Sequence, residues 1–237
     1  MKGPFQFKQF AIHQNHCAMK IGTDGVLLGA WISLKKNPET ILDIGAGTGL
    51  IALMLAQRSE AVTIDALEID DLAYEQCVDN FEASPWGDRL FCYHAGLDEF
   101  IDEIEDQYDL IVSNPPFYTE KVPSGNAARD IARQNQSLPF GELIEGVSNL
   151  LSPSGVFSTI IPYKEEIQLI RLAEQSELYP EYITRVKGNP YTEIIRSLLQ
   201  FSFNKKEVLK DELTIETERH RYTPEYIALT KEFYLRM

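Results

Sequence analysis

Four consecutive residues, Asn114-Pro115-Pro116-Phe117, have the types and the order needed to receive an amino group. They follow an apolar run that ends at Ser113, so they are expected at the end of a β-strand. Two prolines hold an extended turn and remove two backbone donors, which leaves the Asn114 side chain and the Pro115 carbonyl as acceptors. Phe117 offers an aromatic face on which a flipped-out base can stack.

This arrangement favours methylation of the nitrogen that it holds. The lone pair of an aromatic amine is delocalised into its ring, and hydrogen bonds accepted from both protons favour the more tetrahedral nitrogen that attacks a methyl donor. Only interactions that strengthen in the transition state raise the rate. The predicted catalytic residues are therefore Asn114, Pro115, Pro116 and Phe117, and this chemistry requires no metal.

A second motif, Asp43-Ile44-Gly45-Ala46-Gly47-Thr48-Gly49, lies between a strand-like run and a helical stretch. Glycines let the backbone approach a bound nucleoside and turn tightly. Dinucleotide enzymes space them G-x-G-x-x-G, whereas here the third glycine comes one residue earlier and an acid precedes the first. This spacing resembles the loop that binds S-adenosylmethionine. Asp43 is predicted to receive the cofactor's positive amine directly or through water.

Glu68 ends the next apolar run, 19 residues after Gly49. An acid at this place accepts the ribose hydroxyls of a nucleoside cofactor, and its spacing suits a dinucleotide as well as S-adenosylmethionine. The two motifs and this acid predict a set of cofactor-binding residues: Asp43, Gly45, Gly47, Gly49, Glu68 and Asn114.

Short apolar runs alternate with amphipathic stretches, which favours βαβ units around a mostly parallel sheet. Strands are expected at 40–44, 62–68, 90–94, 108–113, 156–161, 182–186 and 194–203, and helices at 50–57, 70–81, 139–151 and 164–175. The last two strands lie too close together for a crossover helix, so they are predicted to form an antiparallel hairpin. The predicted fold is α/β, the Rossmann-like fold of class I methyltransferases. Its seven-stranded, mostly parallel sheet has an antiparallel seventh strand and helices on both faces.

With these motifs the chain resembles the amino-methyltransferases that carry D-x-G-x-G followed by N-P-P-F or N-P-P-Y. Its segments 5–10, 17–31, 129–133 and 222–226 resemble the bacterial tRNA(Val) adenine N6-methyltransferases, which act on the adenine at position 37 beside the anticodon. The resemblance covers nearly the whole chain. It implies S-adenosylmethionine as the cofactor, S-adenosylhomocysteine as the product and the anticodon loop of tRNA as the partner.

The same resemblance implies roles for further residues near the cofactor. Segment 20–25 would fold over the methionine end, with Thr23 and Asp24 nearest to it, whereas the residues alone indicate only a turn before an amphipathic helix. Many relatives place an acid after the third strand to contact the adenine of the cofactor, where this chain has Gly96. Either the Leu97 amide reads this adenine, or Asp98 substitutes for the acid.

The formal net charge of −14 has the wrong sign for a protein that binds nucleic acid through phosphate contacts alone. An RNA-binding function therefore needs local basic patches. Segment 118–137 is long for a loop, and its Lys121, Arg129 and Arg133 are predicted to reach anticodon-loop phosphates. Other candidates are Lys2, Lys8, Lys20, Arg185, Lys187, Lys205, Lys206, Lys210, Arg219 and Arg221.

The 237 residues are expected to form a single methyltransferase domain, 1–237, with extensions at 1–35 over the cofactor and at 204–237. The sequence shows neither a leader pattern nor an apolar run long enough to span a bilayer, so a cytoplasmic protein without membrane contact is expected. Cys17, Cys77 and Cys92 predict neither a disulfide framework nor a zinc site.

Other functions remain open at this level. An N-methyltransferase for guanine or adenine in ribosomal RNA, or for a protein glutamine, would use the same acceptors. The glutamine enzymes usually carry N-P-P-Y and a separate helical N-terminal domain, for which there is no room before a cofactor loop at residue 43. A non-catalytic nucleoside-binding module would not need Asn114 and two prolines. A nicotinamide-dependent oxidoreductase is disfavoured by the glycine spacing.

Overall fold

The computed structural model describes residues 3–17, 20–116 and 138–237. The predicted site residues Phe117, Lys121, Arg129 and Arg133 lie outside this part of the chain. The elements in chain order are β1 (Phe5–Gln6), β2 (Ala11–Ile12), α1 (Thr23–Trp31), β3 (Thr40–Ile44), α2 (Leu50–Arg58), β4 (Thr63–Glu68), α3 (Asp71–Glu82), β5 (Leu90–His94), α4 (Leu97–Glu103), β6 (Tyr108–Ser113), α6 (Phe140–Leu150), β7 (Leu151–Pro162), α7 (Glu166–Gln175), β8 (Tyr179–Lys187), β9 (Ile194–Ser202), β10 (Leu209–Thr214), β11 (Glu216–Glu218), β12 (Arg221–Tyr222) and α8 (Pro224–Thr230).

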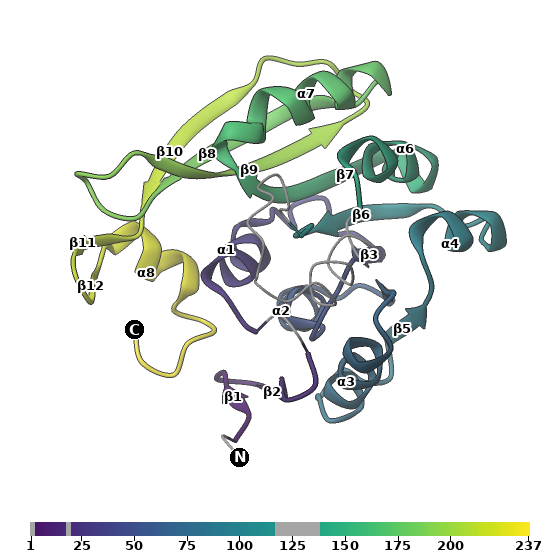
Figure 1. The fold of residues 1–237 in the computed structure, drawn as a ribbon, viewed down its shortest axis with the longest axis horizontal. Helices are drawn as coiled ribbons and strands as arrows, with labels where there is room; N and C mark the ends of the chain where they lie inside the picture. Colours follow the sequence, from purple (N-terminus) through teal and green to yellow (C-terminus); the bar gives the residue numbers. More distant parts are fainter. Residues whose placement is uncertain (1–2, 18–19, 117–137) are drawn as a thin grey trace, which may run out of the picture.

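Within the described residues, one large sheet has the strand order β10-β8-β9-β7-β6-β3-β4-β5 (Figure 1). Strand β9 runs antiparallel to both of its neighbours, and the other neighbouring strands are parallel. The seven predicted strands and their antiparallel hairpin are confirmed. The sheet gains an eighth strand, β10, from the predicted C-terminal extension. Its residues are nearly all exposed or polar, with only Leu213 buried, so no apolar alternation indicates it.

Helices cover both faces of the sheet, and two clusters of buried hydrophobic side chains fill the space beneath them (Figure 1). Helices α1, α2 and α3 contribute to one cluster, and α4, α6 and α7 to the other. The parallel central strands are buried on both faces, which is why they read as continuous apolar runs. This two-sided covering leaves the ends of the strands as the place for a site.

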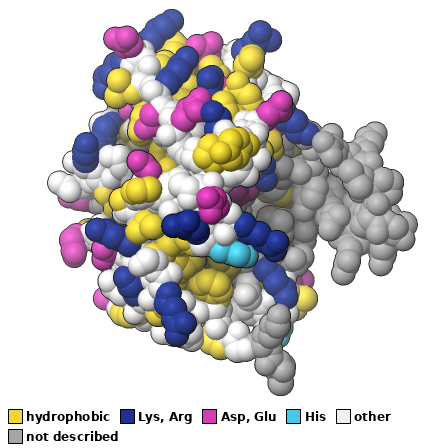
Figure 2. All heavy atoms as spheres, turned by 90° about the vertical axis from the view of Figure 1, so that its left-hand side faces the viewer, with side chains coloured by type: hydrophobic (Ala, Val, Ile, Leu, Met, Phe, Trp, Pro, Cys, Tyr) yellow, Lys and Arg dark blue, Asp and Glu magenta, His cyan; other side chains and the backbone are white. Residues whose placement is uncertain are grey.

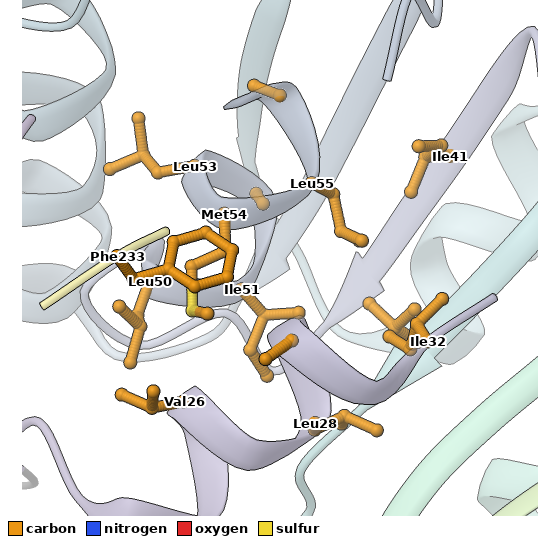
Figure 3. Packing of buried hydrophobic residues seen from close by; sticks show 14 of the residues in the cluster. Val26, Leu28, Ile32, Ile41, Leu50, Ile51, Leu53, Met54, Leu55 and Phe233 are labelled. Carbon is orange, nitrogen blue, oxygen red and sulfur yellow. The ribbon is translucent and has the colours of Figure 1, made fainter. Parts of the chain in front are cut away.

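The two ends of the chain lie side by side. Phe7 forms an isolated antiparallel bridge with Tyr234, and the Lys8 amide donates to the Phe233 carbonyl at 2.8 Å. The Phe233 ring is buried in the same cluster as Leu50 and Met54 of α2 (Figure 3). The predicted terminal extensions are therefore packed onto the helix that follows the glycine loop.

We predict that Phe233→Ala lowers the free energy of unfolding by about 3 to 5 kcal/mol, because it removes a buried ring and leaves a cavity beside α2. Leu235→Ala is the matched control: this side chain is 59% exposed, and its loss should change stability by about 0.5 kcal/mol or less. Urea denaturation followed by circular dichroism measures both values. Equal losses in the two variants would show that Phe233 does not anchor the C-terminal segment.

Candidate active site

The glycine loop after β3 turns with three left-handed residues: Gly45, Gly47 and Gly49 have φ of 74°, 57° and 76°. A side chain at Gly45 or Gly47 would point into open space, with no atom within 4 Å. A side chain at Gly49 would instead meet Phe81 at 2.5 Å and the Cys77 sulfur at 2.9 Å. The first two glycines therefore leave room for a ligand, whereas Gly49 allows α3 to pack against the start of α2.

Glu68 stands at the end of β4 and is held by two backbone amides. Its carboxylate accepts from the Gly47 amide at 2.8 Å and from the Asp70 amide at 2.9 Å. Each carboxylate oxygen has a second lone pair, so the side chain is fixed in place and still able to accept hydroxyl donors. Asp70 accepts from the Ala73 amide at 2.9 Å and caps α3, as its position before a helical stretch indicates.

Asp43 is fully buried at the centre of the sheet, below the loop. One oxygen accepts from the Ala52 amide at 3.2 Å, and the other has no hydrogen-bond partner among the described residues. Burial raises the pKa of this carboxyl to about 7, and the negative charge of Glu68 adds to the shift. Asp43 lines neither of the two cavities at this edge of the sheet. It was predicted to receive the cofactor's amine either directly or through water, and this position favours the contact through water.

Two cavities open at the carboxyl edge of the sheet, on either side of the glycine loop. The first, of ≈ 280 Å³, extends along Glu68 and the residues that follow β5, and the second, of ≈ 460 Å³, extends along residues 20–25 at the start of α1. Gly45, Gly47 and Asn114 line both cavities. Their volumes suit a small elongated ligand that spans the two.

Asn114 lies where the two cavities meet. Its side-chain oxygen is buried and has no hydrogen-bond partner among the described residues. A buried polar atom of this kind calls for an explanation, and a ligand donor is one. Pro115 and Pro116 line the first cavity beside it, so three of the four predicted catalytic residues stand at the ligand space.

The residues predicted for the methionine end also reach a cavity. Thr23 and Asp24 line the second cavity from the first turn of α1. Asp24 accepts a hydrogen bond from the Arg196 guanidinium at 2.8 Å, a partner that the sequence analysis did not identify. Arg196 comes from β9, 172 residues along the chain, and no local pattern links the two.

Leu97 and Asp98 both line the first cavity, at the start of α4. A side chain at Gly96 would begin 2.6 Å from the Asp98 carboxylate oxygen. The Asp98 carboxylate thus fills the space that the first atom of an acidic side chain at position 96 would need. Glycine at position 96 leaves that space to Asp98. Cys17 lines the same cavity, and burial together with the charges of Glu68 and Asp70 raises its pKa to about 11, so its thiol stays protonated.

Known proteins resemble the chain over its full length. It is 64% identical to the tRNA1(Val) (adenine(37)-N6)-methyltransferase of Flavobacterium psychrophilum over 98% of this chain and 100% of that protein. It is 45% identical to the protein of the same description from Bacteroides fragilis, over 98% of both chains. The chain belongs to this methyltransferase family. The family model described as the methyltransferase small domain also matches this methyltransferase, at residues 21–160.

Solved structures agree with the fold of this methyltransferase. A protein described as a predicted O-methyltransferase from Agrobacterium tumefaciens superposes with a TM-score of 0.70 at 17% identity, over 89% of this chain and 96% of that one. One described as a putative class I S-adenosylmethionine-dependent methyltransferase from Listeria monocytogenes gives 0.56 at 18% identity, over 87% and 65%. At such identities the likeness concerns the fold alone.

Two features are absent from the described residues. No helix there is long and apolar enough to cross a membrane, and no group of three or more His, Cys, Asp or Glu side chains is placed to hold a metal ion.

We predict that Asp43→Asn changes how stability depends on pH. Because the pKa of Asp43 rises from 3.8 to about 7 on folding, the folded state binds this proton more tightly. The free energy of unfolding of the wild type should therefore fall as pH rises from about 4 to 7, by up to about 4 kcal/mol from this group. Asparagine keeps an acceptor for Ala52 but does not titrate, so the variant should lack this fall. Urea denaturation across the pH range measures both, and parallel curves would contradict the assignment.

Proposed function

We propose that this methyltransferase transfers the methyl group of S-adenosylmethionine to the exocyclic N6 amine of an adenine in tRNA, at position 37 of tRNA(Val). The observation that carries the proposal is the buried, unpartnered oxygen of Asn114 at the junction of the two cavities. The substrate is taken from the relatives, which match this chain over nearly its whole length.

The residues present fit S-adenosylmethionine. Gly45 and Gly47 leave open space beside their backbone, and Glu68 presents fixed acceptors to ribose hydroxyls in the first cavity. The Leu97 amide or Asp98 would hold the adenine of the cofactor. In the second cavity Thr23 and Asp24 would hold its methionine end, and Asp43 would receive the amine through water.

When bound, the cofactor supplies an electrophilic methyl group, so one carbon–nitrogen bond forms as one carbon–sulfur bond breaks and the amine releases a proton to water. Asn114 accepts one N6 hydrogen through its side-chain oxygen, and the Pro115 carbonyl accepts the other. These two bonds orient the nitrogen lone pair and strengthen as the nitrogen becomes tetrahedral, which is the condition for a rate effect. Pro116 adds no donor that would compete for these acceptors.

Several expectations remain predictions. Stacking of the base on Phe117 and phosphate contacts by Lys121, Arg129 and Arg133 concern residues outside the described part of the chain. We also infer that residues 1–237 act as a single domain in the cytoplasm, without a metal. The buried cluster that includes both Phe7 and Phe233 supports the single domain.

We predict that Asn114→Ala lowers kcat for methyl transfer to unmodified tRNA by about 10² to 10³, the range seen when one preorganised hydrogen-bonding group is removed from an active site. The assay uses labelled S-adenosylmethionine, followed by nucleoside digestion and mass analysis, and the wild type should give N6-methyladenosine. Asn204→Ala, an exposed position at the other edge of the sheet, is the matched control and should retain activity.

Two outcomes would count against this proposal. Equal kcat for Asn114→Ala and the wild type would remove Asn114 from the catalytic residues. Label in ribosomal RNA or in a protein, with none in tRNA, would keep the methyltransferase and replace its substrate.

A further inference from the structure

The net negative charge of the protein is concentrated in one part of the fold. Residues 40–113, from the start of β3 to the end of β6, contain 17 acidic and two basic side chains, a net charge of −15. The rest of the chain contains 19 acidic and 20 basic side chains, a net charge of +1. A polyanion is therefore repelled mainly by the half of the molecule that carries β4, α3, β5 and α4 (Figure 1).

The opposite half presents basic side chains at the carboxyl edge of the sheet. Figure 2 shows the side of the molecule on which β10, β11 and β12 lie, and Lys and Arg side chains lie there on either side of a histidine, with an acidic side chain above it. The turn between β11 and β12 supplies Arg219 and His220, and β12 begins at Arg221; all three are exposed. Tyr191, in the turn between β8 and β9, is 94% exposed. We call these four residues the turn patch.

The turn patch is connected to the active site through hydrogen-bonded backbone and one ion pair. The Ile215 amide donates to the Lys187 carbonyl at 3.0 Å, and the Glu216 amide to the Gly188 carbonyl at 3.0 Å, which joins the two turns. Arg196, at the start of β9, reaches Asp24 on the wall of the second cavity. The patch and the cavities therefore share the carboxyl edge of one sheet.

The separation of the patch from Asn114 suits a folded RNA. Strand β6 ends at Asn114, and β7, β9, β8 and β10 follow it in the sheet. Four interstrand steps of about 4.8 Å amount to roughly 19 Å. A single flipped-out nucleotide does not span that distance, whereas the remainder of a stem and loop does, at about 3.4 Å per nucleotide step.

We propose that the turn patch docks the backbone of the substrate tRNA outside the modified loop, with Arg219 and Arg221 on phosphates and Tyr191 against an exposed base or ribose. The proposal rests on the proposed function, because it takes tRNA as the substrate. Arginine suits phosphate recognition through its forked donors, and an exposed aromatic side chain adds a stacking surface that tolerates any base.

The two acidic side chains of β11 leave the cations of the patch able to bind phosphate. Glu218 pairs with Arg221 at 3.6 Å, but both side chains are more than 70% exposed, and such pairs contribute little. Glu216 accepts from the His220 amide at 3.3 Å, which engages its carboxylate within the turn. A phosphate can therefore displace the first carboxylate, and the second is held by backbone.

The test compares R219E/R221E with K35E/R171E, which makes the same charge change at exposed positions outside the turn patch. Affinity for unmodified tRNA is measured by filter binding between 50 and 200 mM salt, and KM and kcat by methyl transfer. For R219E/R221E we expect an affinity loss of about tenfold and a salt slope smaller by about 2, because each lost phosphate contact removes about 0.9. KM for tRNA should rise with kcat little changed, and K35E/R171E should resemble the wild type.

The neutral pair R219Q/R221Q serves where the reversed charges unfold the turn, and it should lose affinity in the same direction. Equal affinities and salt slopes for both Glu variants, with a wild type that methylates tRNA, would overturn the docking patch alone. A wild type that transfers no methyl group to tRNA would contradict the proposed function and overturn the patch with it, so the two failures are distinguishable.

Discussion

The site depends on the parallel register between β3 and β6. Ile44 lies opposite Ser113 in the sheet, and the Ser113 hydroxyl donates to the Ile44 carbonyl at 2.9 Å. The residues that follow these two strands, Gly45 and Asn114, are thereby placed side by side at the carboxyl edge. A slip of one residue would turn the Asn114 side chain to the other face of the sheet, away from the glycine loop. The register thus joins the loop proposed to bind the cofactor to the residues proposed to receive the amine.

Burial at this edge explains why its polar groups are suited to ligands. The Asp43 carboxyl is fully buried, and burial raises its pKa to about 7. Near neutral pH both of its protonation states are therefore populated, and a positive group placed near it would favour the charged state. The Asn114 oxygen is also buried without a partner among the described residues. In a low-dielectric site each hydrogen bond that a substrate supplies is stronger than the same bond in water. The protein therefore holds acceptors in the folded state that the proposed substrate and cofactor satisfy.

The features that could be predicted from the sequence are those encoded by residues close together in the chain. Asn114 follows the six-residue strand β6, the three glycines of the loop alternate with other residues in one short motif, and Glu68 ends β4, so each stands where its motif indicates. The fold followed from the apolar runs, because strands buried on both faces must be apolar throughout. Gly49 stays a predicted cofactor-binding residue, and its position against Phe81 adds a packing requirement that the sequence did not indicate.

Features that depend on distant residues could not be predicted. The Arg196–Asp24 ion pair joins residues 172 positions apart. Strand β10 has mostly exposed side chains and is specified by its pairing with β8, and α4 spans only seven residues, too few for a helical period to stand out. The fold was also needed to locate the acidic side chains in one half of the molecule, because the net charge alone indicates only that its sign is unfavourable for binding RNA.

A crystal structure of the methyltransferase with S-adenosylhomocysteine tests the central claim most directly, because the claim is that one ligand spans both cavities and turns its sulfur toward Asn114. We expect continuous density that crosses Gly45 and Gly47, with ribose hydroxyls on Glu68, the amino acid end beside Thr23 and Asp24, and the sulfur beside the Asn114 oxygen. Density that lies in only one cavity, or with the sulfur directed away from Asn114, would contradict it.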